Sequence, residues 1–390
     1  PPPAHGGLDL HGHEIGRHGA AAAGAPTLVV VAALHGNEPA GIHAARRVLA
    51  RLARDGVALR GSLVALAGNL PALAARRRFI DHDLNRAWTP ERVAAVADPT
   101  AAPLPADAAE NATMRALYGH LAAAMSAAGG PVHVLDLHTT SSRSAPFVLF
   151  ADTLRNRAFA RAFPLPMVLG LEEQIEGAML NHLVEQGCVC VGVEGGQHDA
   201  PAAVDNLEAL LWLALAHLGM LPPHAAPDLA ACRDRLVRAR GDVPPALEVR
   251  YRHAIGPADA FRMAPGYANF QPVAAGEAIA SDRCGAVRAA EAGRILMPLY
   301  QGQGEDGFFM TRAIDPRWLD VSTALRQLRV CRLLPLLPGV RRHPVDRATL
   351  VVDTRVARWF PLQVFHLLGY RRRRWDGARL VVSRRGHDGA

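Results

Sequence analysis

The stretch Thr27–Gly41, TLVVVAALHGNEPAG, decides the fold. Its first eight residues are apolar and rich in β-branched side chains, which is typical of a short buried strand. A polar turn follows, and then apolar residues at helical spacing continue to Leu52. His35 and Glu38 therefore lie where a central strand gives way to a helix, the usual place for a site in an α/β sheet. An imidazole and a carboxylate three residues apart can lie side by side and suit a zinc ion.

The alternation of strand-like and helix-like segments continues along the chain. Further strands are predicted at residues 62–67, 131–137 and 188–193, and helices at residues 38–54, 108–128 and 204–218. Polar residues end several of these strands. The pattern predicts an α/β fold of three layers, with a mixed, largely parallel sheet between helices.

The pattern changes near residues 221–223. Residues 247–310 contain short strand-like segments separated by Gly and Pro, which predicts a small β domain. Residues 311–390 hold 17 Arg and 6 Asp, a balance of +11, although their apolar clusters are typical of a folded segment. We therefore expect a catalytic domain at 1–222, a small β domain at 223–310 and a basic Arg-rich extension at 311–390.

Composition excludes several classes of protein. The chain has 390 residues, 50% of them hydrophobic, and no apolar run of the ~18 residues that a membrane span requires. The chain has no Lys, which excludes a Schiff-base lysine, a Walker lysine and a lipoyl attachment site. Five Cys without a CxxC motif are typical of reduced thiols in a cytoplasmic protein. The N-terminus lacks the order of a signal peptide, but the chain does not begin with Met, so a processed leader stays open.

Polar clusters at strand ends and on adjoining loops supply the parts of a zinc hydrolase. Two His and one Glu form a common catalytic zinc set that leaves a position for water. The reaction also needs a separate carboxylate as general base, and an Arg near the metal can stabilise an oxyanion. A second Arg with an Asn can hold a substrate carboxylate. The clusters are His35/Glu38, Arg78 with Asn85 and Arg86, His138, and Glu194.

The order of these motifs resembles that of a known family. HGNE at 35–38, RRFIDHDLNR at 77–86, DLH at 136–138 and VEGG at 193–196 resemble the succinylglutamate desuccinylase/aspartoacylase family. The resemblance covers roughly residues 14–310 and implies a zinc-carboxypeptidase-like fold with a β domain behind it. The later stretch GEAIASDRCGAVRAAEAGRILMP resembles a lipoyl-like β fold without its attachment Lys.

The resemblance also implies a role for each site residue. It makes His35, Glu38 and His138 the ligands of one Zn²⁺ per chain, Glu194 the general base, Arg78 the oxyanion-stabilising residue, and Asn85 with Arg86 the pair that holds the substrate carboxylate. Two departures argue against aspartate-type substrates. Residues 181–190 lack the Arg that aspartoacylases carry there, and Phe308-Phe309 stands where they use a Tyr.

Neighbouring polar residues are expected to have supporting roles. Asp81, Asp83 and Asp136 are predicted to orient their neighbours, for instance by accepting a hydrogen bond from a ligand His. His133 alternates onto one face of a predicted strand and is expected to be packed there.

The leading hypothesis is a zinc-dependent hydrolase that cleaves the amide bond of a small N-acyl amino acid or related N-acyl amine. The substrate would be a small molecule with a free carboxylate. One alternative is a metallocarboxypeptidase that acts on peptides. Another is a protein that binds an anionic partner, nucleic acid or a membrane, through residues 311–390 and has a vestigial site. A homo-oligomer also stays open.

Overall fold

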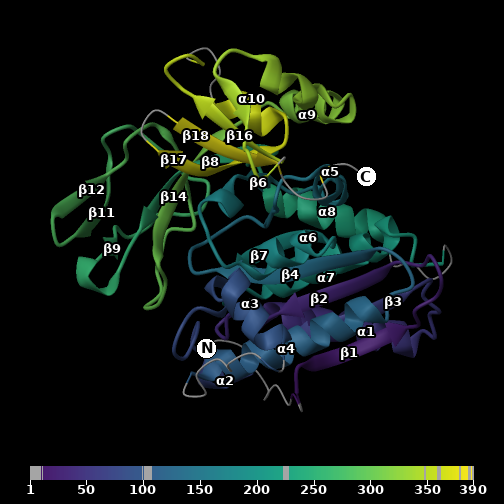
Figure 1. Ribbon diagram of the computed structural model, residues 1–390. Helices are drawn as coiled ribbons and strands as arrows, with labels where there is room; N and C mark the ends of the chain where they lie inside the picture. The colour runs from purple at the N-terminus through teal and green to yellow at the C-terminus, as the bar shows by residue number, and fades with distance from the viewer. Residues whose placement is uncertain are drawn as a thin grey trace.

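A computed structural model of the chain describes residues 10, 12–98, 100, 108–222, 228–346, 348–357, 362–376, 379–384 and 388. Within these residues the largest sheet has eleven strands, in the order β1-β3-β2-β4-β7-β5-β6-β8-β14-β13-β10 (Figure 1). Two smaller sheets hold the strands β12-β11-β9 and β15-β16-β18-β17.

The middle of the large sheet is parallel. Strands β3 (Ser62–Ala67), β2 (Thr27–Ala32), β4 (Val132–Thr140) and β7 (Val189–Gln197) run in one direction, and β1 (Glu14–Gly19) closes the edge antiparallel to β3. The predicted α/β fold with a mixed, largely parallel sheet is therefore confirmed.

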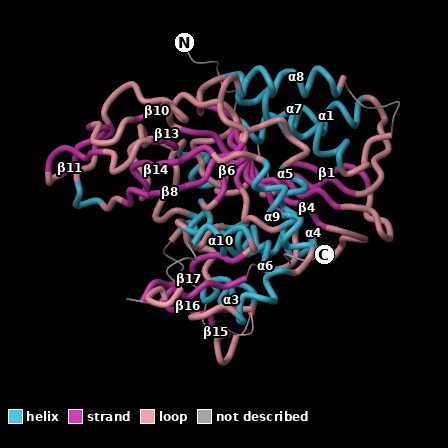
Figure 2. Tube along the Cα trace, turned by 90° about the horizontal axis from the view of Figure 1, so that it is seen from above, coloured by secondary structure: helices cyan, strands magenta, loops and turns pink. Residues whose placement is uncertain are grey.

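Helices cover both faces of these strands (Figures 1 and 2). On one face lie α1 (Ala40–Arg54) and α7 (Pro201–His217), with α8 (Leu229–Arg240) packed on α7. On the other lie α3 (Pro90–Ala97), α4 (Ala109–Ser126) and α6 (Met179–Glu185). Two shorter helices, α2 (Leu70–Ala75) and α5 (Leu154–Ala160), complete this part. Helix α8 was not predicted, because its sequence, LAACRDRLVRAR, lacks a strong apolar stripe and buries only Leu236 among its residues.

The strands β4 and β7 are longer than predicted, and this places two site residues. β4 continues to Thr140 and β7 to Gln197, so His138 and Glu194 lie within the strands and are paired with each other in register. Helix α1 starts close above the same strands. A Cβ on Gly41 would lie 2.8 Å from the Cβ of Leu137, so only Gly allows this approach.

Strands from the second half of the chain extend the same sheet. β5 (Phe147–Leu149), β6 (Met167–Leu169), β8 (Ala246–Ala254), β14 (Asp306–Ala313), β13 (Gly293–Leu296) and β10 (Pro272–Val273) follow β7 in space. The small sheet of β9 (Arg262–Met263), β11 (Ala278–Asp282) and β12 (Gly285–Arg288) lies beyond them (Figure 1). The region predicted to be rich in short strands is therefore attached to the large sheet by backbone hydrogen bonds.

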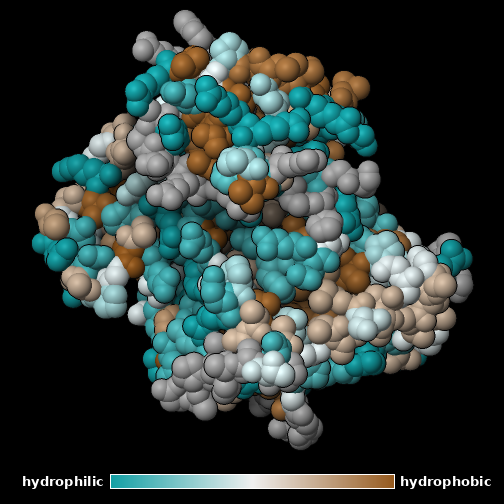
Figure 3. Space-filling view, in the orientation of Figure 1, coloured by the Kyte–Doolittle hydropathy of each residue, from teal (hydrophilic) through white to brown (hydrophobic). Residues whose placement is uncertain are grey.

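The described residues of the Arg-rich extension are folded. They form α9 (Arg317–Gln327), the 3₁₀ helix η4 (Val330–Leu336), α10 (Leu362–Leu367) and a sheet of β15 (Val340–Arg342), β16 (Thr349–Asp353), β17 (Tyr370–Asp376) and β18 (Arg379–Arg384). This part has its own apolar core, which includes Phe365 and Val382. Apolar side chains also gather on its surface over α9 and η4, where Trp318, Leu328 and Leu336 are exposed (Figure 3).

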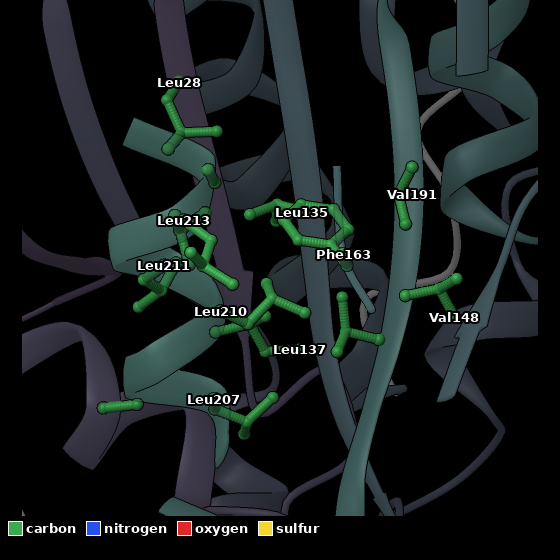
Figure 4. Close-up of a cluster of buried hydrophobic side chains, with 14 of the residues drawn as sticks. Leu28, Leu135, Leu137, Val148, Phe163, Val191, Leu207, Leu210, Leu211 and Leu213 are labelled. Atoms are coloured by element: carbon green, nitrogen blue, oxygen red, sulfur yellow. The ribbon is translucent and has the colours of Figure 1, made fainter. Parts of the chain in front are cut away.

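The main core fills both faces of the parallel strands. Along β2, Leu28 and Val30 pack towards α1 and α7, whereas Val29 and Val31 pack towards α4 and α6. Figure 4 shows the first of these layers, where Leu207 and its neighbours in α7 meet the strand residues. Burial on both faces explains why β2 is apolar at every position after Thr27. All five cysteines are free thiols, and none of the described helices is both long and apolar enough to cross a bilayer.

Candidate active site

A single pocket collects the polar residues that the motifs singled out. It lies where β2, β4 and β7 end, and the second half of the chain supplies its remaining wall. The pocket is lined by His35, Glu38, Arg78, Asn85, Arg86, His138 and Glu194, which are all seven of the predicted site residues.

Three of these residues converge on one point. His35 follows β2, Glu38 precedes α1, and His138 belongs to β4. The Nδ1 atoms of the two histidines lie 3.0 Å from Oε1 and Oε2 of Glu38, respectively. All three residues are buried, and one ligand atom from each lies within 4.8 Å of the others. The residues can therefore offer two nitrogens and one oxygen to a metal, the donor set of many catalytic zinc sites.

Each histidine has an aspartate at its other ring nitrogen. The Nε2 of His35 lies 3.1 Å from Oδ1 of Asp83, and the Nε2 of His138 lies 2.9 Å from Oδ2 of Asp136. These contacts hold both rings with Nδ1 directed at Glu38. Carboxylates in this position fix the tautomer of a ligand histidine and raise its basicity. The expectation that Asp83 and Asp136 orient ligand histidines agrees with these contacts.

The electrostatics of the cluster follow from burial and pairing. Burial opposes the charged form of Glu38, but His35 and His138 outweigh it and hold the pKa of this carboxyl well below its usual range. Burial also opposes charge on His138, but Asp136 and Glu38 outweigh it and raise the pKa of the imidazole well above its usual value. The surroundings therefore favour the ionised form of Glu38 together with a positive charge beside it. A bound metal cation could supply that positive charge in place of a protonated His138.

Glu194 stands beside this cluster. It is paired in register with His138 across β4 and β7, and its side chain is buried. Its Oε2 has no hydrogen-bond partner among the described residues. Burial raises the pKa of Glu194 well above its usual range, while His138 and Arg78 act in the opposite direction. Glu194 thus places a buried carboxyl group next to the candidate metal cluster. One of its oxygens accepts no hydrogen bond from the described residues.

Arg78 lies close to the same cluster. Its Nε and Nη2 donate to Oδ2 of Asp83 at 3.0 and 2.9 Å, and its Nη1 lies 3.8 Å from Oε1 of Glu38. Asp83 therefore fixes both Arg78 and His35. The guanidinium is held within reach of a substrate atom bound at the cluster.

Asn85 and Arg86 lie further along the pocket. Oδ1 of Asn85 accepts from the backbone N–H of Met179 at 3.0 Å, so the side-chain NH₂ group is the part left for a ligand. Nη2 of Arg86 donates to Oδ2 of Asp306 at 2.7 Å, and its buried Nε has no partner among the described residues. Both residues can thus donate hydrogen bonds to an acceptor such as a carboxylate.

The motifs gave no role to the loop between β13 and β14, although it forms the roof of the pocket. Oε1 of Gln301 accepts from Nδ2 of Asn37 at 2.7 Å and lies 3.2 Å from Nε2 of His198. Gln303 donates to the backbone oxygen of Phe79 at 3.1 Å. The signal in the sequence is the run QGQGED at 301–306, in which polar side chains alternate with Gly before a strand.

Apolar residues form a second wall that motif reasoning also missed. The pocket is lined there by Leu149, Leu171, Ile175, Leu180, Met297 and Phe309. Within the segment where aspartoacylases carry an Arg, Asn181 faces the pocket, and of the Phe308-Phe309 pair Phe309 lines it. These apolar residues come from several separate segments and lie at no fixed distance from a motif in the sequence. Only the fold shows that they line the same wall of the pocket.

Solved structures with the same fold are known. The chain covers 86% of an ectoine utilization protein from Ruegeria pomeroyi, at 21% identity and a TM-score of 0.53 over 75% of this chain. It covers 83% of a succinylglutamate desuccinylase from Vibrio cholerae, at 18% identity and a TM-score of 0.52 over 75% of this chain. At these identities the likeness shows the fold alone.

Sequence comparisons cover part of the chain. A curated succinylglutamate desuccinylase from Photorhabdus laumondii is 40% identical over 83 residues, which is 21% of this chain and 23% of that protein. The chain thus matches about a quarter of the length of this relative. Residues 24–217 match the model of the succinylglutamate desuccinylase/aspartoacylase catalytic domain. With this match, the shared fold and the ordered motifs, the chain belongs to the succinylglutamate desuccinylase/aspartoacylase family.

Proposed function

We propose that this protein is a zinc-dependent deacylase that hydrolyses the amide bond of a small N-acyl amino acid or related N-acyl amine. The observation that carries the proposal is the convergence of His35, Glu38 and His138 in the pocket that also contains Glu194 and Arg78.

His35, Glu38 and His138 would hold one zinc ion, because they offer two imidazole nitrogens and a carboxylate whose orientation Asp83 and Asp136 support. A bound zinc ion supplies a Lewis acid that makes water a better nucleophile at neutral pH and polarises a carbonyl.

Glu194 is the proposed general base. Its buried carboxyl lies beside the cluster, with one oxygen free of partners in the described protein. In this role it accepts a proton from the attacking water and delivers it to the nitrogen of the leaving amine. A carboxyl with a raised pKa holds that proton better between the two steps than an exposed carboxyl does.

The two arginines are proposed to have separate tasks. Arg78, held by Asp83 near Glu38, donates hydrogen bonds to the oxygen of the tetrahedral intermediate. Arg86 and the NH₂ group of Asn85, which line the pocket, hold the substrate carboxylate through hydrogen bonds.

Three variants separate these roles in steady-state kinetics on N-acyl amino acids. Glu194→Gln is expected to keep its zinc and to lose several orders of magnitude in kcat, because it removes a proton acceptor and no metal ligand. Arg78→Ala is expected to lower mainly kcat, and Arg86→Ala to raise mainly KM. An Arg86→Ala effect that is equal for carboxylate and carboxamide substrates would contradict the carboxylate-binding role.

A substrate panel tests the reaction class. The proposal predicts hydrolysis of N-acyl amino acids and little turnover of tripeptides with free C-termini. Faster cleavage of the peptides would favour a metallocarboxypeptidase, and no hydrolysis of either class by the zinc-loaded protein would reject catalysis by this site.

A further inference from the structure

The walls of the pocket carry information about the rest of the substrate. Building on the proposed deacylase function, we propose that the site takes an N-acyl amino acid with one carboxylate whose other substituents are uncharged and apolar. A substrate with a second carboxylate, on its acyl group or its side chain, would be disfavoured.

The first argument is the balance of charge around the pocket. Among the described lining residues only Arg78 and Arg86 carry guanidinium groups, and the chain has no Lys. Six lining residues are carboxylates: Glu38, Asp136, Glu172, Glu194, Glu305 and Asp306. Even with Glu194 left aside, the other five carboxylates offset the two guanidinium groups, Arg252 and the two charges of a bound zinc ion. The pocket therefore offers a dianionic substrate no net positive charge.

The second argument is the net charge at the end of the pocket where Arg86 lies. Oδ2 of Asp306 accepts from Arg86, and its Oδ1 accepts from Nε of Arg252. Arg252 also donates to the backbone oxygen of Gln174 at 2.6 Å. Two guanidinium groups and one carboxylate leave one positive charge. Nε of Arg86 has no partner among the described residues, and Asn85 adds the NH₂ group of its side chain as a donor, so this end fits a single carboxylate.

The third argument is that the apolar wall beside this end contributes no further cation among the described lining residues. Leu171, Ile175 and Phe309 are each at least 90% buried and line the pocket together with Leu180. Arg78 is held by Asp83 beside the candidate metal cluster, where its Nη1 also lies 3.8 Å from Oε1 of Glu38. A carboxylate placed against this wall would lose its hydration without gaining a partner, whereas an alkyl group would gain from burial.

Equilibrium binding tests the inference without relying on turnover. We would use the zinc-loaded Glu194→Gln protein, which should not consume its ligands, and titrate it with N-acetylleucine and N-acetylaspartate in a calorimeter. We expect the Kd for N-acetylleucine to be at least tenfold lower than the Kd for N-acetylaspartate. Equal affinities, a preference for N-acetylaspartate, or binding of neither compound would overturn the inference.

A gain-of-charge variant tests which wall sets the preference. Asn181 lies at the start of α6, is partly exposed and lines the pocket. In the same background, Asn181→Arg should lower the Kd of N-acetylaspartate at least tenfold, and the matched control Asn181→Gln should not. No change in the arginine variant, or an equal change in both, would contradict the assignment of this wall.

The two proposals can fail separately. If N-acetylleucine binds with the expected preference but the zinc-loaded wild type hydrolyses no N-acyl amino acid, the deacylase function is wrong and the substrate inference holds. If the wild type hydrolyses N-acetylaspartate faster than N-acetylleucine, the function holds and the inference is wrong.

Discussion

His35 and His138 show how much a motif predicts at the scale of the residue. The motifs supplied the histidines and Glu38, and their placement at strand ends was enough to expect them in one site. The sequence could not predict which ring nitrogen of each histidine faces Glu38. That choice depends on Asp83 and Asp136, which contact the other nitrogen of each ring. The partner of Arg86 was also unpredictable, since Asp306 lies 220 residues away in the sequence.

His133 gives a prediction about stability and pH. It packs edge-on against Phe159, and burial, with Arg155 and His217 nearby, lowers its pKa to about 4. As the pH falls below about 6.5, His133 is protonated in the unfolded chain but stays neutral in the folded chain. The free energy of unfolding is therefore not reduced by this group above pH 6.5, and it falls as the pH drops towards 4, by about 3 kcal/mol in all.

Urea unfolding between pH 4 and 7 checks this expectation. His133→Leu should unfold with a flatter pH profile than the wild type over this interval. The difference between the two proteins isolates His133 from the other groups that titrate there. Parallel profiles would mean that His133 is solvated in the folded protein.

At the scale of the element, strands and helices were predicted better than their ends. β2, β4, β7, α1 and α7 were all expected from periodicity, because each buries a strong apolar pattern. β4 and β7 nevertheless continue through polar residues that sequence reasoning placed after the strands. Backbone pairing of His138 with Glu194 decides the extension, and pairing between distant segments leaves no local signal.

The roof loop between β13 and β14 offers a test at this scale. Gln301→Ala removes hydrogen bonds to Asn37 and His198 that hold the loop over the pocket. Each neutral hydrogen bond contributes about 1 kcal/mol, so the loss of both is expected to raise KM for an N-acyl substrate by up to about thirtyfold, with zinc content unchanged. Gln327→Ala, on the exposed face of α9, is the control. An unchanged KM in Gln301→Ala would show that the loop does not shape the site.

At the scale of the whole molecule, buried ion pairs attach the Arg-rich extension to the catalytic part. Arg326 of α9 has a fully buried side chain and donates to Oδ2 of Asp152 at 2.7 Å and to Oδ1 of Asp388 at 3.1 Å. Arg157 of α5 donates to the same Asp152 and to the backbone oxygen of Leu319. Part of the positive charge of this extension is therefore engaged inside the protein, which net charge alone could not reveal.

Asp152→Asn tests this attachment. The change leaves two buried guanidinium groups without their shared carboxylate and should lower the free energy of unfolding by about 3 kcal/mol. Asp320→Asn is the matched control, because its pair with Arg161 is exposed and should contribute under about 1 kcal/mol. Urea unfolding of both variants and the wild type would measure the two effects. Similar small effects of the two changes would show that the buried pair does not hold the extension in place.

The metal content of three proteins tests the central claim most directly. Wild type, His138→Ala and Glu194→Gln would be purified in parallel, equilibrated with zinc, dialysed and measured by elemental mass spectrometry. We predict one zinc per chain in the wild type and in Glu194→Gln, and almost none in His138→Ala, because His138 offers a ligand atom and Glu194 a proton acceptor. Full zinc in His138→Ala, or loss of zinc from Glu194→Gln, would contradict the account.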